Sequence, residues 1–180
     1  MKNKVLLHAC CAICAAYPID LLREMEYEPI VYFFNPNIFP SEEFERRLSE
    51  LIRYTQKKKV KLIIDKPASS DWYKFISGFE NEPEKGKRCS LCFKYRLMNT
   101  ALKALELEIT QFTTTLTVSP HKNSKVIFEI AKEIANKNKL EFLDIDFKKK
   151  DGFLKSMKIA KEENFYRQNY CGCEFSVKKV

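Results

Sequence analysis

The segment that decides the fold is KVLLHACCAICAAYPIDLLRE, residues 4–24. Its apolar start, Lys4–His8, predicts a buried strand, and Ala15–Glu24 predicts a helix that tolerates Pro18 only near its first turn. Between them, Ala9–Cys14 is expected to form a loop. A strand followed directly by a helix begins a strand–helix–strand unit, and such units build parallel sheets.

The rest of the chain continues this alternation of strands and helices. Further strands are predicted at Pro29–Phe34, Lys61–Asp65, Phe112–Leu116 and Leu140–Ile145. Helices are predicted after Ser41 and at Trp72–Phe79, Leu91–Leu105, Lys125–Asn136 and Phe153–Glu163. We therefore expect an α/β fold with a mainly parallel sheet, in a single domain over residues 1–180. Sites in such sheets form where loops leave the carboxyl ends of the strands, which places the loop after the first strand at a site.

Charge and hydropathy restrict the partners of the chain. Lys and Arg outnumber Asp and Glu by 32 to 24, which gives a formal charge of +8 and a sequence pI near 9.0. This surplus favours a polyanion such as nucleic acid, although a solvated Lys/Glu-rich surface of the kind found in heat-adapted proteins fits equally well. No apolar run approaches the roughly 20 residues that span a membrane, and the apolar start is too short for a signal peptide. We expect a cytoplasmic protein without a membrane partner.

Seven cysteines fall into three clusters in the sequence. They are Cys10-Cys11-x-x-Cys14, Cys89-x-x-Cys92 and Cys171-Gly172-Cys173. Without a signal peptide, such spacing indicates metal or redox chemistry more than a disulfide framework. Close pairs allow one short segment to direct two thiolates at one point, and clusters far apart in sequence can then complete a four-sulfur shell.

Four interpretations of the cysteines stay open on spacing alone. A structural zinc site would take the four thiols of the second and third clusters. An iron–sulfur cluster would take four thiolates and leave other thiols nearby for chemistry. A thiol-exchange motif at Cys11 and Cys14, with Pro120 as its loop proline, would follow a strand and open a helix. The fourth interpretation is buried thiols without a function.

The third cluster has a chemistry of its own. A disulfide between Cys171 and Cys173 would close a tight ring, and Gly172 is the residue best able to adopt the dihedral angles required. Such a bond would be comparatively easy to reduce, and the dithiol could deliver two electrons at once. The alternative is that both sulfurs are metal ligands.

Several polar residues are candidates for proton transfer or substrate contact. His121 could donate a proton, and Lys122 beside it could hold a phosphate, unless the pair only makes contacts at a helix entry. Asp146, near the end of the last predicted strand, could be a proton donor or an iron ligand, or could cap the following turn. Asn35 and Asn37 could read a base edge from their loop.

A basic and aromatic stretch near the C-terminal end of the sequence is a candidate RNA-binding surface. It contains Lys148 and Lys149, and Tyr166 and Arg167 follow. Aromatic and Arg side chains stack well on the splayed bases of single-stranded RNA. A solvated helix face would have a similar composition.

Six motifs taken together resemble one known family, the cobalamin-independent epoxyqueuosine reductases. The motifs are LLHACCAICAAYP, FFNPNIFPSEEFERR, RCSLCFKYRL, FTTTLTVSPHK, DFKKKDGF and YRQNYCGCEFS, and they extend from about Val5 to Ser176. The resemblance implies a Rossmann-like domain similar to the adenine-nucleotide α-hydrolase (HUP) type. It implies the last step of queuosine biosynthesis, in which the epoxide oxygen is removed reductively from the epoxyqueuosine wobble base in the anticodon loop of tRNA.

The resemblance also implies cofactors and their ligands. It implies a [4Fe-4S] cluster, leaves one additional iron open, and calls for an external electron donor. Carried over by position, the cluster ligands are Cys10, Cys11, Cys89 and Cys92. By the same resemblance, Cys171 and Cys173 are a redox-active pair or help to hold a second iron, and Cys14 is a ligand to that iron or a buried thiol.

Two other functions compete with this interpretation. An ATP-using tRNA sulfurtransferase of related fold needs a Gly/Ser-rich pyrophosphate loop after the first strand, but this chain has HACCAIC there and only 4 glycines in all. A zinc-stabilised RNA-binding module without catalysis would be colourless, whereas a [4Fe-4S] protein is brown.

Overall fold

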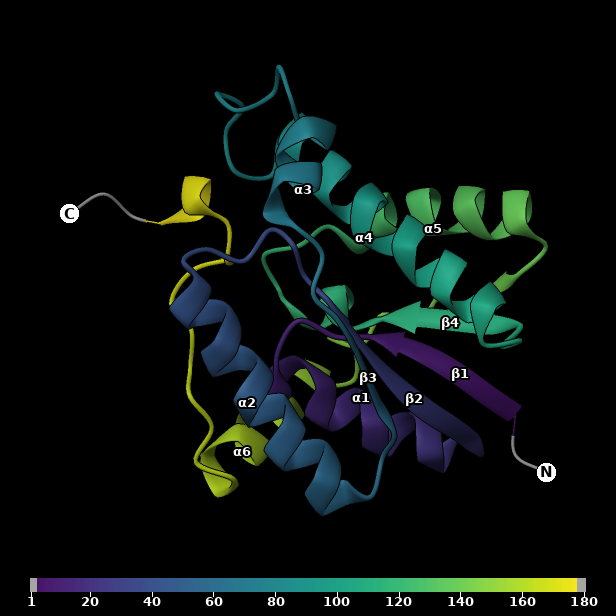
Figure 1. Cartoon of the computed structure of the whole chain (residues 1–180). Coiled ribbons are helices and arrows are strands. Elements are labelled where there is room, and N and C mark those ends of the chain that lie inside the picture. The colour runs from purple at the N-terminus through teal and green to yellow at the C-terminus, as the bar shows by residue number, and fades with distance from the viewer. Residues whose placement is uncertain (1–2, 178–180) are drawn as a thin grey trace.

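Five parallel strands form the centre of the computed structural model, which describes residues 3–177 (Figure 1). The strands are β1 (Asn3–His8), β2 (Tyr27–Phe34), β3 (Leu62–Asp65), β4 (Gln111–Thr114) and β5 (Glu141–Phe142). They lie in the order β3-β2-β1-β4-β5, and each pairs in parallel with its neighbour. The predicted α/β fold with a parallel sheet is confirmed.

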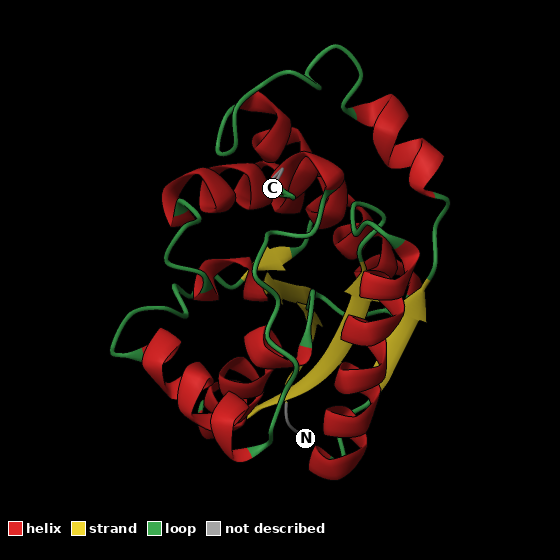
Figure 2. Ribbon diagram, turned by 90° about the vertical axis from the view of Figure 1, so that its left-hand side faces the viewer, coloured by secondary structure: helices red, strands yellow, loops and turns green. Residues whose placement is uncertain are grey.

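Helices cover both faces of the sheet (Figures 1 and 2). One layer consists of α1 (Ala12–Glu24), α2 (Ser41–Lys58) and α6 (Gly152–Glu162). The other consists of α4 (Lys87–Glu106) and α5 (Ser124–Asn138), and the short α3 (Ser69–Phe75) packs on α4. Two 3-10 turns, η1 (Thr115–Val118) and η2 (Glu174–Ser176), complete the elements of the described residues.

The alternation of side chains along the central strands produces two separate cores. Val5 and Leu7 of β1 pack with the layer of α1, α2 and α6, whereas Leu6 faces α4 and α5. In the same way, Phe33 of β2 belongs to the first core and Tyr32 to the second. Successive side chains of a strand point to opposite faces, so a strand buried on both sides is apolar throughout.

The order of the strands fixes where a site can form. From β1 the chain builds outward through β2 to β3, and it then crosses back to place β4 on the other side of β1. The direction of winding therefore reverses between β1 and β4. Ligands of open α/β sheets bind in the crevice at the carboxyl ends of the strands beside this reversal. The loop after β1, which carries Cys10 and Cys11, lies at this point.

Three predicted boundaries near the cysteines differ from the structure. Helix α1 begins at Ala12, so Cys14 lies in its first turn rather than in a loop, and Pro18 lies inside the helix. Helix α4 begins at Lys87, which places the second cysteine cluster in its first two turns. The strand predicted at Phe112–Leu116 turns into η1 after Thr114. In each case an element starts or stops where tertiary contacts favour it, and local sequence does not show those contacts.

Within residues 3–177, every helix is too short or too polar to cross a lipid bilayer.

Substitution of Gly152, at the start of α6, tests how tightly α6 packs on the rest of the fold. A Cβ atom at this position would lie 1.8 Å from the carbonyl oxygen of Phe147 and 2.7 Å from Tyr17 Cε1. Because the nearer atom belongs to the backbone, Gly152→Ala must displace the start of α6. We expect the free energy of unfolding to fall by about 1–3 kcal/mol in urea denaturation. Leu154→Ala, at an exposed position of the same helix, is the matched control and should change it by less than about 0.5 kcal/mol. Equal stability of the two variants would contradict this packing.

Candidate metal centre

Three thiols meet at the carboxyl end of β1. The Sγ atoms of Cys10, Cys11 and Cys14 all lie within 4.8 Å of one another, and those of Cys10 and Cys11 are 3.8 Å apart. The turn between β1 and α1 brings the first two together, and the first turn of α1 adds the third. The first cysteine cluster of the sequence is therefore one group of sulfurs in space.

The three thiols differ in their affinity for protons. Hydrogen bonding with Cys11 and Cys14 holds the pKa of Cys10 well below its ordinary value, and the positive charges of Arg96 and Lys122 act in the same direction. The interaction with Cys10 raises the pKa of Cys11 to about 12, and hydrogen bonding with Cys10 and Cys11 raises the pKa of Cys14. A thiolate ligated to a metal has lost its proton, so a metal bound here would displace the protons of Cys11 and Cys14.

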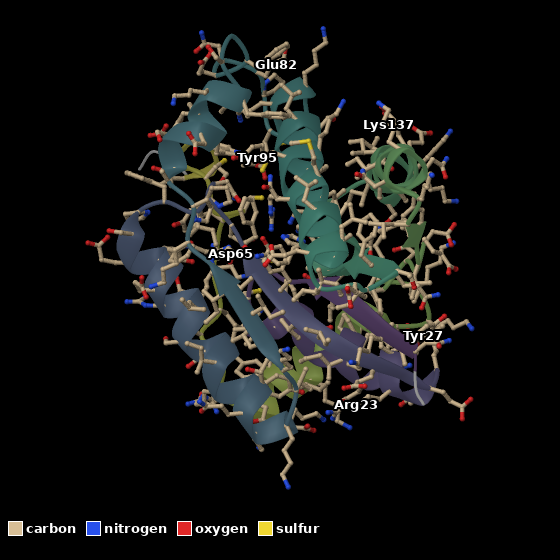
Figure 3. The ribbon with its side chains drawn as sticks, turned by 45° about the vertical axis from the view of Figure 1, so that its right-hand side comes forward. Arg23, Tyr27, Asp65, Glu82, Tyr95 and Lys137 are labelled. Atoms are coloured by element: carbon tan, nitrogen blue, oxygen red, sulfur yellow. The ribbon has the colours of Figure 1, made fainter. Side chains whose placement is uncertain are left out.

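The other four cysteines form a second group. Cys92 and Cys173 are buried in one apolar cluster with Trp72 and Ile76, and Tyr95 packs against this cluster. Figure 3 shows Tyr95 on α4, and the centroid of its ring lies 4.9 Å from that of Phe75 on α3, with the ring planes tilted by 49°.

The acidity of this group reflects its burial. Burial raises the pKa of Cys92 to about 11. The pKa of Cys89 is also raised, by burial first and then by the neighbouring charge of Cys171. The structure thus brings the second and third clusters of the sequence side by side.

Lys122 connects the two groups electrostatically. Burial acts to lower the pKa of its ammonium, but the negative charges of Cys171, Cys10 and Cys14 outweigh this effect and raise it. Lys122 therefore stays protonated, and its positive charge acts on thiols of both groups.

The segment before the third cluster is fixed to α2 and to the first cluster. Arg47, which is 1% exposed, donates to the carbonyl oxygens of Cys171 at 3.1 Å and Tyr170 at 3.4 Å. The amide of Phe39 donates to the carbonyl oxygen of Gly172 at 2.8 Å. Gln168 donates from Nε2 to the sulfur of Cys11 at 3.1 Å. The C-terminal segment, residues 163–177, thus contacts the first cluster at Cys11, and Figure 1 shows it running alongside α2.

The remaining candidates for proton transfer lie near α5. His121 is exposed in the turn that precedes α5, and its backbone amide donates to Ser119 Oγ at 3.3 Å. Asp146 accepts a hydrogen bond from Ser124 Oγ at 2.9 Å and pairs with Lys148 at 3.3 Å. The carboxylate of Asp146 thus holds the first residue of α5.

The two predicted asparagines have different surroundings. Asn35 donates from Nδ2 to the carbonyl oxygen of Ala9 at 2.9 Å and accepts from Arg96 at 2.6 Å, so both ends of its amide bind within the protein. Asn37 is 3% exposed, and its Oδ1 has no hydrogen-bond partner among the described residues. Asn37 therefore has a buried acceptor that no described residue satisfies.

The aromatic and basic candidates lie on the C-terminal segment and the turn before α6. The hydroxyl of Tyr166 donates to Glu43 at 2.8 Å, and its ring lies 4.7 Å below the guanidinium of Arg46. Arg167 and Lys149 are exposed, and the ammonium of Lys148 is turned inward to Lys122 O and Ser124.

Three residues of the site were not predicted from the sequence. They are Arg47, Arg96 and Gln168. A usable signal existed for Arg96, which lies four residues after Cys92 and therefore on the same face of α4. Arg47 occupies an inward-facing position of α2 at helical spacing from buried apolar residues, where a charged side chain implies a specific partner. Nothing in the sequence indicates the contact of Gln168 with Cys11.

The donor set suits a centre bound by thiolates. Seven thiols lie in two neighbouring groups at one edge of the sheet, all seven are free, and the cations Arg96 and Lys122 accompany them. Thiolates are the ligands of iron–sulfur clusters and of structural zinc, and nearby positive charges offset their negative charge. The residues present therefore fit a metal centre.

Comparison with known proteins places the chain in a sequence family. The model of the family described as "Epoxyqueuosine reductase QueH" matches residues 5–179. The protein of that description from Streptococcus pyogenes serotype M1 is 35% identical over 184 residues, which cover 99% of this chain and 72% of the relative. The one from Thermotoga maritima is 32% identical over 176 residues, covering 96% and 90% respectively.

Solved structures share the fold at low sequence identity. The U34-tRNA thiolase NcsA from Methanococcus maripaludis, solved with its [4Fe-4S] cluster, superposes with a TM-score of 0.65 at 12% identity, over 98% of this chain and 62% of the thiolase. A predicted subunit of a tRNA methyltransferase from Methanocaldococcus jannaschii gives a TM-score of 0.60 at 11% identity, over 98% of this chain and 100% of its own. At these identities the likenesses show the fold alone, and they agree with the predicted Rossmann-like α/β domain.

Substitution of Arg47 tests whether contacts with α2 hold the C-terminal segment in place. Its guanidinium also pairs with Glu43 at 2.6 Å, and that carboxylate is 7% exposed. Arg47→Met leaves the buried carboxylate without its cation, so we expect the free energy of unfolding to fall by about 3–5 kcal/mol. The double variant Arg47→Met/Glu43→Gln should recover part of this stability.

Amide hydrogen exchange separates the two effects. Both variants should lose protection at the amides of Gly172, which donates to Ser176 Oγ, and Phe39, which donates to the carbonyl oxygen of Gly172, because the contacts that hold this segment to α2 are gone. Full protection of these amides in the double variant would show that Arg47 does not hold the segment.

Proposed function

Because this chain belongs to the epoxyqueuosine reductase QueH family, we propose that it removes the epoxide oxygen of epoxyqueuosine in a tRNA anticodon loop at a [4Fe-4S] cluster. The resemblance found in its motifs is confirmed, and the chain is an oxidoreductase, an epoxyqueuosine reductase of the queuosine pathway. The observation that carries the proposal is the meeting of the Cys10, Cys11 and Cys14 thiols at the winding reversal of the sheet.

We assign the cluster to two pairs of cysteines. Cys10 and Cys11 would hold it from the loop after β1, and Cys89 and Cys92 from the first turns of α4. Cys14, which lies with the first pair, would be available to one additional iron. The Cys171/Cys173 pair would act as a redox-active dithiol or, as the alternative, help to hold that iron. When bound, the cluster would supply electrons singly, and the additional iron would act as a Lewis acid.

The Cys171/Cys173 pair matches the electron demand of the reaction. Conversion of the epoxide to an alkene consumes two electrons and two protons and releases one water. Oxidation of one dithiol to its disulfide yields two electrons and two protons. Each turnover would therefore consume one dithiol and leave one disulfide. An external electron donor would then return the disulfide to the dithiol.

We also assign residues to proton transfer and to contact with the substrate. We assign proton transfer to Asp146 and His121, and contact with the substrate's phosphate to Lys122. We also assign Asn37 a contact with a nucleobase: its Oδ1 has no partner among the described residues, and because this atom is buried, the contact would require the loop around Asn37 to move. The amide of Asn35 is already bound to Ala9 and Arg96, so its contribution would be to shape the loop.

The tRNA would approach along the C-terminal segment. The formal charge of +8 favours a polyanion, and the Tyr166 ring with the exposed Arg167 offers stacking and cationic contacts suited to a single-stranded loop. Lys148 and Lys149 would add positive charge beside Lys122. We also propose that the enzyme acts in the cytoplasm, where a tRNA substrate would be available.

Metal analysis and a turnover assay test the proposal. Protein purified without oxygen should show a broad absorption band near ~400 nm and contain about four irons and four sulfides per chain. With a chemical reductant it should convert epoxyqueuosine in tRNA to queuosine, detected by mass spectrometry of digested nucleosides as the loss of one oxygen. A colourless protein with about one zinc would refute the cluster, and an excess of iron over sulfide would indicate the additional iron.

Cysteine variants test the division of the thiols into ligands and electron carriers. Cys173→Ser should lower turnover at least about 100-fold, as expected when a group needed for the chemistry is lost, while most of the visible absorbance remains. Cys92→Ser is the comparison and should lose the absorbance. Loss of the absorbance in Cys173→Ser would instead make Cys173 a ligand.

Removal of one exposed positive charge tests the approach of the tRNA. Arg167→Gln should weaken tRNA binding and reduce the salt dependence of the binding constant, because a phosphate or stacking contact is lost. Lys137→Gln removes an equal charge from the far end of α5, labelled in Figure 3, and should leave binding unchanged. Equal affinities of the two variants would contradict this path.

A further inference from the structure

Arg96 is a buried cation whose charge is not matched by a carboxylate. It lies in α4, is 2% exposed, and forms no ion pair with an Asp or Glu of residues 3–177. Its Nη2 donates to Asn35 Oδ1 at 2.6 Å, and its Nε donates to His8 Nε2 at 3.3 Å. A ring that accepts at Nε2 carries its proton on Nδ1, which lies 2.9 Å from Thr114 Oγ1, so His8 is a neutral acceptor. A buried guanidinium with neutral acceptors alone is costly unless a negative charge lies nearby.

Both cysteine groups lie beside Arg96 in the fold. Its partner Asn35 donates to the carbonyl oxygen of Ala9, the residue that directly precedes Cys10 in the loop after β1. Cys92 precedes Arg96 by four residues, so both side chains project from one face of α4. The guanidinium therefore lies where ligands from the two groups approach one another.

We propose that Arg96 is a positioning residue that offsets the negative charge of the metal centre between Cys10 and Cys92 and thereby raises its reduction potential. This inference rests on the proposed [4Fe-4S] cluster. Four thiolates give such a cluster a net negative charge, and the electron it accepts makes that charge larger. A fixed cation in a water-poor site stabilises the reduced form more than the oxidised form.

Arg96 also has a structural role, which is independent of its effect on the reduction potential. Through Asn35, whose amide donates to the carbonyl oxygen of Ala9, Arg96 also supports the loop that carries Cys10 and Cys11. Arg96→Gln keeps a hydrogen-bond donor but loses the charge. Arg96→Lys keeps the charge but loses the planar fork of donors. The two variants therefore distinguish charge from support of the loop.

The experiment is a redox titration of the iron-loaded protein, followed by electron paramagnetic resonance and visible absorbance. We expect Arg96→Gln to have a lower midpoint potential than the parent at the same iron and sulfide content, and Arg96→Lys to stay near the parent. Lys103→Gln is the matched control, because Lys103 lies on the same helix and pairs with Asp65 and Glu106. Its midpoint should not change.

Each outcome decides the inference. An unchanged midpoint in Arg96→Gln overturns it while the proposed function stands. A parent protein without a redox-active iron centre removes the proposed cofactor and this inference with it. If Arg96→Gln does not fold or take up iron, Arg96→Lys decides: a parent-like potential supports the role of the charge. Loss of the centre in a folded Arg96→Lys would show that the geometry of the fork matters and would overturn the inference.

Discussion

The common direction of the five strands is the constraint on which the site depends. Because β1 pairs in parallel with both β2 and β4, the three carboxyl ends of these strands lie at one edge, and the chain must leave each of them through a loop there. The loop after β1 carries the first cysteine cluster, and η1 begins directly after β4. An antiparallel neighbour would send its loop to the opposite edge. The thiols are therefore gathered by backbone pairing before any metal contributes to the fold.

Electrostatic balance is the second requirement of the site. Burial alone opposes thiolates, and it does raise the pKa of Cys92. The chain compensates by placing Arg96, Lys122 and Arg47 around the sulfurs. Of these, Arg47 has a carboxylate partner, Glu43, whereas the partners of Arg96 among residues 3–177 are neutral. Positive charge is thus compensated unevenly around the thiols.

The fold could be predicted from the sequence much more completely than the site. Apolar segments bounded by turns revealed the strands, because a strand covered on both faces must be apolar throughout. The short strand β5 and the early starts of α1 and α4 were mispredicted, since contacts from distant segments set those ends. For the site, cysteine spacing identified the clusters but not their grouping in space. The contacts of Gln168 with Cys11 and of Arg47 with Cys171 join residues more than a hundred positions apart, and no local pattern encodes such pairs.

The pairing of β1 with β4 also has a consequence for how the protein folds. His8 on β1 lies opposite Thr114 on β4, and their side chains are linked across 106 positions of sequence. Closing so long a loop costs conformational entropy before any contact compensates for it, whereas β1, β2 and β3 follow one another closely along the chain. We therefore expect β1–β3 to assemble first, with Cys10 and Cys11 open to solvent until β4 and the C-terminal segment dock. During that interval the thiols are accessible to oxidants as well as to iron, so the redox state of the surroundings would influence the yield of active protein as strongly as the stability of the finished fold.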